Sequence, residues 1–255
     1  MYIAYIAGLP RIDARYWVIM LLASACGTNL GDFASQTLDL GFIGAFVPYV
    51  LIFAAMFVAA RRVQAGGEIF YWVAIVISRA GATDIADLAS HQLKLDYLAL
   101  AVLLLTLLAS ILVVGLLRGQ TTIVATRLPN GDWDDRPNSN ATYWAAMVTA
   151  SVIGTMSGDY LVDDLGLGVG AGSVLLLALT ALAAAVAARG KRLIKPLYWL
   201  TVLLMRTGAT NLGDFLSGDD GLNLGFFAGS IGLFSLMLVV IALWKGRAVP
   251  RLQEA

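Results

Sequence analysis

Four copies of one pattern divide this chain, and each copy places a carboxylate within an apolar stretch. In every copy a Tyr-Trp pair is followed, sixteen residues after the tyrosine, by an aspartate. The copies read YWVIMLLASACGTNLGDF, YWVAIVISRAGATDIADL, YWAAMVTASVIGTMSGDY and YWLTVLLMRTGATNLGDF. Their aspartates are Asp32, Asp87, Asp159 and Asp214. A carboxylate in hydrocarbon costs roughly 2.5–3.5 kcal/mol on insertion scales, so its recurrence at one register indicates a role for it.

The composition is that of an integral membrane protein. Hydrophobic residues make up 59% of the 255 positions and charged residues only 13%, whereas about 25% is usual in soluble domains. The net charge of zero gives nucleic acid no overall electrostatic attraction to the chain. Cys26 and His91 are the only residues of their types, which excludes an internal disulfide, a thiolate-rich metal site and bis-histidine haem. We therefore expect no cofactor.

Each copy is the first half of a two-helix repeat. A short polar turn follows it, and then a second apolar run at about 41–60, 97–117, 167–188 or 223–244. A bilayer core is spanned by about 20 apolar residues in a helix. The sequence therefore predicts an all-α membrane protein with eight transmembrane helices from four tandem two-helix repeats.

The spacing of the copies predicts two related halves. Tyr16 and Tyr71 are 55 residues apart, the next interval is 72, and Tyr143 and Tyr198 are again 55 apart. The predicted organisation is a first half at 1–118, a cytoplasmic linker at 119–141 and a second half at 142–255. Because every repeat has an even number of spans, the two pseudo-symmetric four-helix halves should be related by an axis along the membrane normal.

Orientation follows from the basic residues. Fourteen of the seventeen lie on one side of the predicted spans: Arg11, Arg15, Arg61, Arg62, Arg118, Arg127, Arg136, Arg189, Lys191, Arg192, Lys195, Lys245, Arg247 and Arg251. Loops rich in Lys and Arg stay in the cytoplasm, so both termini, the linker and the Tyr-Trp pairs are predicted to be cytoplasmic. Aromatic rings also gather at the membrane–water interface. We accordingly interpret the repeated tryptophans as interface anchors: Trp17, Trp72, Trp144 and Trp199.

A polar stripe runs along the first helix of each repeat. Positions 8, 12 and 16 after the tyrosine share one helix face because they are four residues apart. Position 8 alternates between serine and arginine: Ser24, Arg79, Ser151 and Arg206. Position 12 is always threonine: Thr28, Thr83, Thr155 and Thr210. Three residues before each aspartate are Asn29, Asp84, Met156 and Asn211. Polar stripes of this kind face a bundle interior or a watery cavity.

Helical rise places the arginines and aspartates at different depths. At 1.5 Å per residue, Arg79 and Asp87 lie roughly 12 Å apart along their helix, too far for a direct pair. We expect Arg79 and Arg206 to act as internal counter-charges that meet a carboxylate or a carbonyl of a neighbouring repeat. Glycines beside the stripe allow either close helix packing or a local break that frees carbonyls for a cation.

The four copies resemble a bacterial membrane-protein family defined by tandem repeats of unknown function. Each repeat of that family has two transmembrane regions and a characteristic tryptophan, to which Trp17, Trp72, Trp144 and Trp199 correspond. The resemblance covers residues 16–246, and copy three departs most because Met156 replaces the asparagine of two other copies. It implies an architecture and a location in the bacterial inner membrane, and no settled activity.

The leading functional hypothesis is a secondary transporter or permeation pathway for a small cation, either a hard metal ion or a proton. The four aspartates and four threonines would bind the ion, helped by Asn29, Asp84 and Asn211, since oxygen ligands suit hard cations. The expected partners are the lipid bilayer and that cation.

Two other hypotheses remain open. A buried Arg-Asp network can fix helix packing without transporting anything. An intramembrane aspartyl protease would use two aspartates on facing helices. The Asn-Leu-Gly-Asp segments that end at Asp32 and Asp214 approach its Gly-x-Gly-Asp motif but lack the first glycine.

Overall fold

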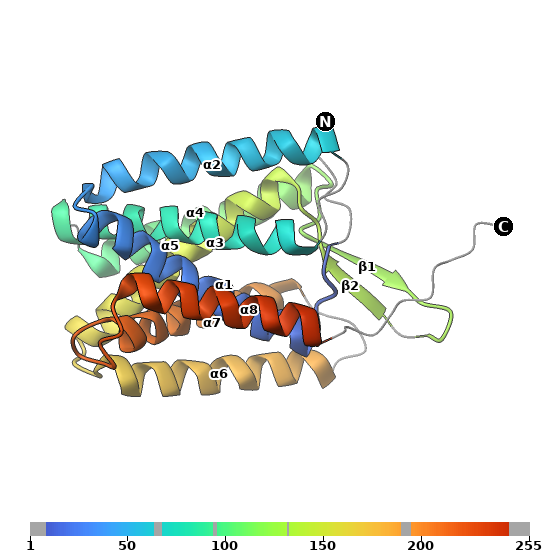
Figure 1. Ribbon diagram of the computed structural model, residues 1–255. Coiled ribbons are helices and arrows are strands. Elements are labelled where there is room, and N and C mark those ends of the chain that lie inside the picture. The colour runs from blue at the N-terminus through green and yellow to red at the C-terminus, as the bar shows by residue number, and fades with distance from the viewer. Residues whose placement is uncertain (1–8, 64–67, 94–95, 132, 190–194, 245–255) are drawn as a thin grey trace.

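The computed structural model describes residues 9–63, 68–93, 96–131, 133–189 and 195–244, and its long helices lie side by side in one bundle (Figure 1). In chain order the elements are α1 Ala14–Asp32, η1 Phe33–Thr37, α2 Gly41–Val63, α3 Glu68–Asp87, η2 Leu88–Gln92, α4 Tyr97–Leu117, β1 Ile123–Arg127, β2 Trp133–Pro137, α5 Ala141–Asp163, α6 Val169–Arg189, α7 Lys195–Ser217 and α8 Phe226–Leu243. The eight predicted helical runs are therefore confirmed as eight long helices.

The first helix of each repeat belongs to a closed inner ring. α1 packs on α3, α3 on α5, α5 on α7, and α7 returns to α1. Each second helix packs mainly on the first helix of the following repeat: α2 on α3, α4 on α5, α6 on α7 and α8 on α1. The last of these contacts joins the end of the chain to its beginning. The inner helices are consequently buried, while the outer helices expose apolar side chains such as Leu103, Leu117 and Leu182.

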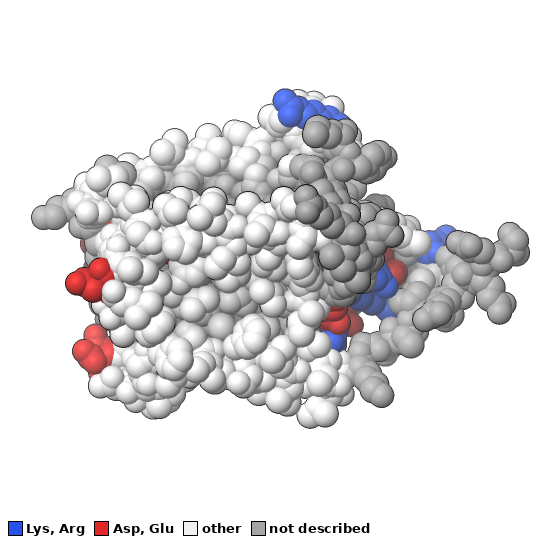
Figure 2. Space-filling view, turned by 45° about the horizontal axis from the view of Figure 1, so that its top comes forward, with Lys and Arg blue, Asp and Glu red and all other residues white. Residues whose placement is uncertain are grey.

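The outside of the bundle is suited to lipid. Within the described residues, six helices are long and apolar enough to cross a membrane: α1 with η1, α2, α3 with η2, α4, α6 and α8. α5 and α7 fall outside this set. Both are inner helices, and α7 buries polar side chains that include Thr201, Arg206 and Asn211. Figure 2 shows a band without charged atoms over the middle of the visible face, with acidic residues at one end and both basic and acidic residues towards the other. These features indicate a membrane-embedded protein.

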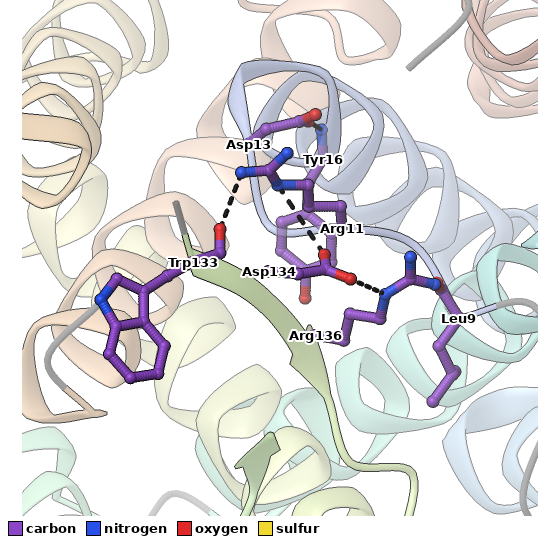
Figure 3. Close-up of polar contacts among 7 residues, drawn as sticks. All are labelled: Leu9, Arg11, Asp13, Tyr16, Trp133, Asp134 and Arg136. Carbon is purple, nitrogen blue, oxygen red and sulfur yellow. Dashed lines mark hydrogen bonds and ion pairs between the residues drawn. The ribbon is translucent and has the colours of Figure 1, made fainter. Parts of the chain in front are cut away.

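The segment predicted as a polar linker, 119–141, contains an antiparallel hairpin of β1 and β2. The stretch before α1 is bound along this hairpin, as Figure 3 shows. The Arg11 guanidinium donates to the Trp133 carbonyl at 2.7 Å, and the Arg136 guanidinium donates to the Leu9 carbonyl at 2.8 Å. The linker is thus an ordered part of the fold that contacts the N-terminal segment.

The hairpin covers one end of the inner ring. Ile123 of β1 is 4% exposed and packs in the same core as the Tyr-Trp pairs. The Thr122 and Ser139 hydroxyls accept hydrogen bonds from the indole N–H groups of Trp199 and Trp144, at 3.3 and 2.7 Å. We call this the tyrosine end of the bundle, and the opposite end, where the four repeated aspartates lie, the aspartate end. The division into halves at 1–118 and 142–255 stays a prediction.

Glycines of repeats one and three allow the inner helices to approach closely. A Cβ on Gly27 would lie 2.6 Å from both the Arg79 Cβ and the Val76 carbonyl oxygen. A Cβ on Gly154 would lie 2.4 Å from the Arg206 Cβ. α1 runs unbroken through Gly27 and Gly31, so these glycines serve packing and not a helix break. The same contacts bring each arginine against the helix of the preceding repeat.

We predict that Gly27→Ala and Gly154→Ala destabilise the fold. The added methyl group has no space between α1 and α3 or between α5 and α7, and overpacking of this kind costs about 1–3 kcal/mol. The midpoint of thermal unfolding in detergent measures the effect. Gly81→Ala is the matched control, because the nearest atom to its added Cβ would be 3.5 Å away, an ordinary contact. Equal midpoints for all three variants would contradict the close-packing interpretation.

Candidate functional site

The polar stripes of the four inner helices meet inside the ring as stacked layers, which we call the central column. Successive layers are four residues apart, or about 6 Å along the helices. From the tyrosine end, they are the tyrosine layer, an apolar layer, the serine–arginine layer, the threonine layer and the aspartate layer. The apolar layer consists of four fully buried side chains: Met20, Ile75, Met147 and Val202. The column therefore begins at the Tyr-Trp pairs, which the sequence-based stripe did not include.

Four tyrosine hydroxyls close the tyrosine end of the column. Tyr16 lies 2.9 Å from Tyr71 and 2.7 Å from Tyr198, measured between hydroxyl oxygens. Tyr143 completes the circle at 2.5 Å from Tyr71 and 3.0 Å from Tyr198. The four side chains are at most 1% exposed. Helix caps fix two of them, because Asp13 and Asn140 accept from the backbone N–H groups of Tyr16 and Tyr143.

The repeated tryptophans link neighbouring repeats. Each tyrosine ring packs on the tryptophan of the following repeat, with ring centroids 5.3–5.9 Å apart: Tyr16 on Trp72, Tyr71 on Trp144, Tyr143 on Trp199 and Tyr198 on Trp17. An interface anchor presents its ring to lipid, whereas these four tryptophans are at most 8% exposed. The difference arises because the inner helices place their first turns inside the ring and leave the lipid-facing surface to the outer helices.

Arg79 crosses the column and contacts all three other repeats. Its guanidinium donates to the hydroxyls of Thr28 and Thr210 and to the carbonyls of Ser151 and Arg206. Arg79 thus makes the expected contact with a carbonyl of a neighbouring repeat, and the role of Arg79 and Arg206 as internal counter-charges stays a prediction. Because these bonds run towards the threonine layer, the positive charge of Arg79 lies on the side of the aspartates.

Arg206 occupies the same register but points the other way. Its Nη2 donates to the sulfur atoms of Met147 and Met20 in the apolar layer, at 3.0 and 3.7 Å. Among the described residues its Nε and Nη1 atoms have no hydrogen-bond partner, and the side chain is fully buried. Two arginines at one level repel each other, and the opposite directions of their side chains keep the two charges apart.

Threonines and aspartates line a cavity of about 350 Å³ at the aspartate end. Its walls contain all four members of both layers: Thr28, Thr83, Thr155, Thr210, Asp32, Asp87, Asp159 and Asp214. Gln36, Phe42 and Phe226 also line it, and the Gln36 amide donates to Asp32 at 3.1 Å. Exposure increases outwards: Thr28 is 1% and Asp32 5% exposed, and Asp159 and Asp214 are half-buried. The column is therefore closed at the tyrosine end and open towards the aspartate end.

The three predicted helper residues lie outside this cavity. Asn29 donates to Ser217 at 2.6 Å and occupies the space left by Gly213 and Gly229. Asn211 lies in the corresponding space at Gly158 and Gly172. A residue three positions before another is displaced by about 60° around a helix with 3.6 residues per turn. These side chains therefore point between helices and not at the axis.

Asp84 lies in the corresponding place between α3 and the first repeat. It is 1% exposed, and the Ser35 hydroxyl is close enough to interact with it. Neither carboxyl oxygen forms a well-directed hydrogen bond with the described residues. Within those residues, no three His, Cys, Asp or Glu side chains are arranged to hold a metal ion. The helix after Asp32 and after Asp87 widens into a π-helical segment, η1 and η2 respectively.

Comparison with known families agrees with the repeat pattern. Residues 15–65, 142–192 and 197–248, together more than half of the chain, match the family described as Repeat of Unknown Function (DUF347). The chain belongs to this family. The matches cover repeats one, three and four, and the repeat formed by α3 and α4 takes the equivalent place in the ring. The family description names no chemistry. No curated protein and no solved structure matches the chain.

The tyrosine circle predicts a measurable contribution to stability. Tyr16→Phe removes a hydroxyl that lies within 3.4 Å of three others and leaves buried partners unsatisfied. A loss of about 1–3 kcal/mol in the free energy of unfolding is expected, measured by chemical or thermal unfolding in detergent. Tyr160→Phe, at a side chain that is 37% exposed, should have little effect. Similar stabilities of the two variants would contradict a structural role for the circle.

Proposed function

We propose that this protein transports a small cation across the bacterial inner membrane, with the four aspartates of the central column as its binding groups. In this proposal all eight long helices span the bilayer, and the two halves are pseudo-symmetric. The observation that supports it most is the cavity, because four carboxylates from four different helices line one space that ends in a closed layer of the same column.

Charge favours a cation over an anion. Arg79 is directed towards the cavity, and Arg206 is directed away from it. Four acidic side chains therefore face the cavity together with one guanidinium. Charges of one sign that line a concave, low-dielectric site raise the local concentration of the opposite ion. A bound cation or proton would offset the free-energy cost of placing these carboxylates inside a membrane bundle.

The size of the cavity favours a cation larger than a dehydrated metal ion. A volume of about 350 Å³ compares with a share of about 30 Å³ per molecule in liquid water. The site has room for an ion with part of its hydration shell or for a small organic cation. This modifies the metal ligation expected from sequence, since direct ligation needs oxygens that converge at 2.0–2.6 Å.

The closed layers suggest how transport would be gated. The excess of basic residues favours a cytoplasmic tyrosine end, and in this orientation the cavity would face the opposite side. Five of the fourteen basic residues in that count lie outside the described residues: Lys191, Arg192, Lys245, Arg247 and Arg251. Passage to the cytoplasm then requires the serine–arginine layer and the tyrosine circle to open, while the cavity closes, as alternating access demands.

Cation flux into proteoliposomes tests this proposal. Changing Asp32, Asp87, Asp159 and Asp214 to asparagine, singly and together, should lower uptake by about tenfold or more, because a charged hydrogen-bonding group contributes about 1.5–3 kcal/mol. Asp219→Asn is the matched control, since that exposed acid lies at the same end but does not line the cavity. Wild-type flux in the fourfold variant, or no flux above empty vesicles for any cation tested, would refute the proposal.

A further inference from the structure

The contacts of Arg79 show how this column binds a guanidinium group. Two threonine hydroxyls and two backbone carbonyls surround it: Thr28, Thr210, Ser151 and Arg206. A guanidinium presents five N–H donors in one plane, and here it forms four hydrogen bonds with acceptors from three repeats. The threonine layer is thus already a receptor for one planar cation.

The repeat pattern supplies the same set of acceptors a second time. Repeats three and four carry the same residue types at these positions as repeats one and two. Each partner of Arg79 has an equivalent residue two repeats further around the ring. These equivalents are the hydroxyls of Thr155 and Thr83 and the carbonyls of Ser24 and Arg79. Arg206 is the residue equivalent to Arg79, but its guanidinium is turned towards Met147 and Met20. Among the described residues, no guanidinium therefore occupies the second acceptor set.

Thr155 shows that this second set is unsatisfied. Its hydroxyl is buried, with the side chain 1% exposed, and has no hydrogen-bond partner among the described residues. Thr83 donates only a long bond, 3.3 Å, to the carbonyl of Arg79 in its own helix, which leaves its oxygen free to accept. Both threonines line the cavity. A buried polar group without a partner is costly. The unpartnered Thr155 hydroxyl and the free acceptor of Thr83 face the same space, which a ligand can enter.

Two carboxylates line the cavity next to Thr83 and Thr155, on the side of the aspartate end. Asp87 and Asp159 follow Thr83 and Thr155 by one helical turn on α3 and α5, and they line the same cavity. A ligand bound to these threonines would therefore lie next to the carboxylates of the aspartate layer. Because Arg206 points away, Arg79 is the one described residue that adds positive charge to the threonine layer. Hydroxyl and carboxylate oxygens spread over two layers suit a planar fork of donors better than a spherical ion.

We propose that the substrate of the cavity is a small cation with a guanidinium group, bound at Thr83, Thr155, Asp87 and Asp159. This inference rests on the proposed cation transport and names the class of cation. The guanidinium ion itself is the smallest member of that class. It would lie opposite Arg79. Its N–H groups would donate hydrogen bonds to the two threonine hydroxyls, and the two aspartates would neutralise its positive charge.

Binding to the purified protein in detergent tests the substrate class. Guanidinium chloride at low millimolar concentration, far below the molar range in which it denatures proteins, should raise the midpoint of thermal unfolding. Tetramethylammonium and potassium chloride at equal ionic strength should not, because neither donates hydrogen bonds. Isothermal titration calorimetry then gives the affinity. No shift with guanidinium, or an equal shift with tetramethylammonium, would overturn the inference.

Variants locate the site. Thr155→Val and Thr83→Val should each weaken guanidinium binding by about tenfold, and Thr155→Ser should restore it because the hydroxyl is kept. Thr149→Val is the control: Thr149 is on the same helix, bonds to its own Ala145 carbonyl and does not line the cavity. Unchanged affinity in both valine variants would refute this location. If either valine variant does not fold, the other variant and Thr155→Ser give the same comparison.

Competition in vesicles separates this inference from the general proposal. If guanidinium inhibits or replaces the flux of other cations, the inference is supported. If the aspartates are required for the flux of another cation and guanidinium neither binds nor competes, the substrate class is wrong and cation transport stands. If guanidinium binds in a Thr155-dependent way and no cation crosses, the site is supported and transport is refuted.

Discussion

The burial of polar side chains in a lipid-embedded bundle is the constraint on which this structure depends. Every inner helix contains polar groups that are costly in hydrocarbon. Together the four helices contain two buried arginines and the four repeated aspartates. A closed ring of four helices gives them one shared interior, and a second layer of helices supplies the apolar surface. Arg79 is tolerated because carbonyls and hydroxyls surround it, whereas the hydrogen bonds of Arg206 go to thioether sulfurs. The aspartates are tolerated because they line a cavity that opens at one end.

Closure of the ring depends on contacts between each repeat and the next. Second helices pack on the following repeat, tyrosines pack on the following tryptophan, and Asn29 or Asn211 inserts beside glycines of the preceding one. No repeat completes its own core. This explains why the tandem copies form one body, and why α7 must return to α1 before the column is enclosed.

The helices and most of the cavity could be predicted from the sequence, because apolar runs and a spacing of four residues are local signals. The eight helices appear where expected, and every threonine and aspartate of the stripe lines the cavity. Asn29, Asp84 and Asn211 were misplaced because a shift of three residues moves a side chain off the axis. The tyrosine circle was missed although Tyr16 precedes Ser24 by two steps of the same spacing. Interface preference gave those aromatics a sufficient explanation. The opposite directions of Arg79 and Arg206 depend on three-dimensional contacts, so no pattern could reveal them.

The four tyrosine hydroxyls can arrange the hydrogen bonds of their circle in two ways. Each hydroxyl has one proton to donate, and four hydroxyls meet around four edges, so the donors can run clockwise or anticlockwise. In either sense the bond dipoles circulate and largely cancel along the axis. The circle therefore closes this end of the column by the packing of its four side chains and adds little electric field along the axis. Reversing the sense requires only rotation of the hydroxyl groups. The circle can therefore rearrange its protons without moving a helix.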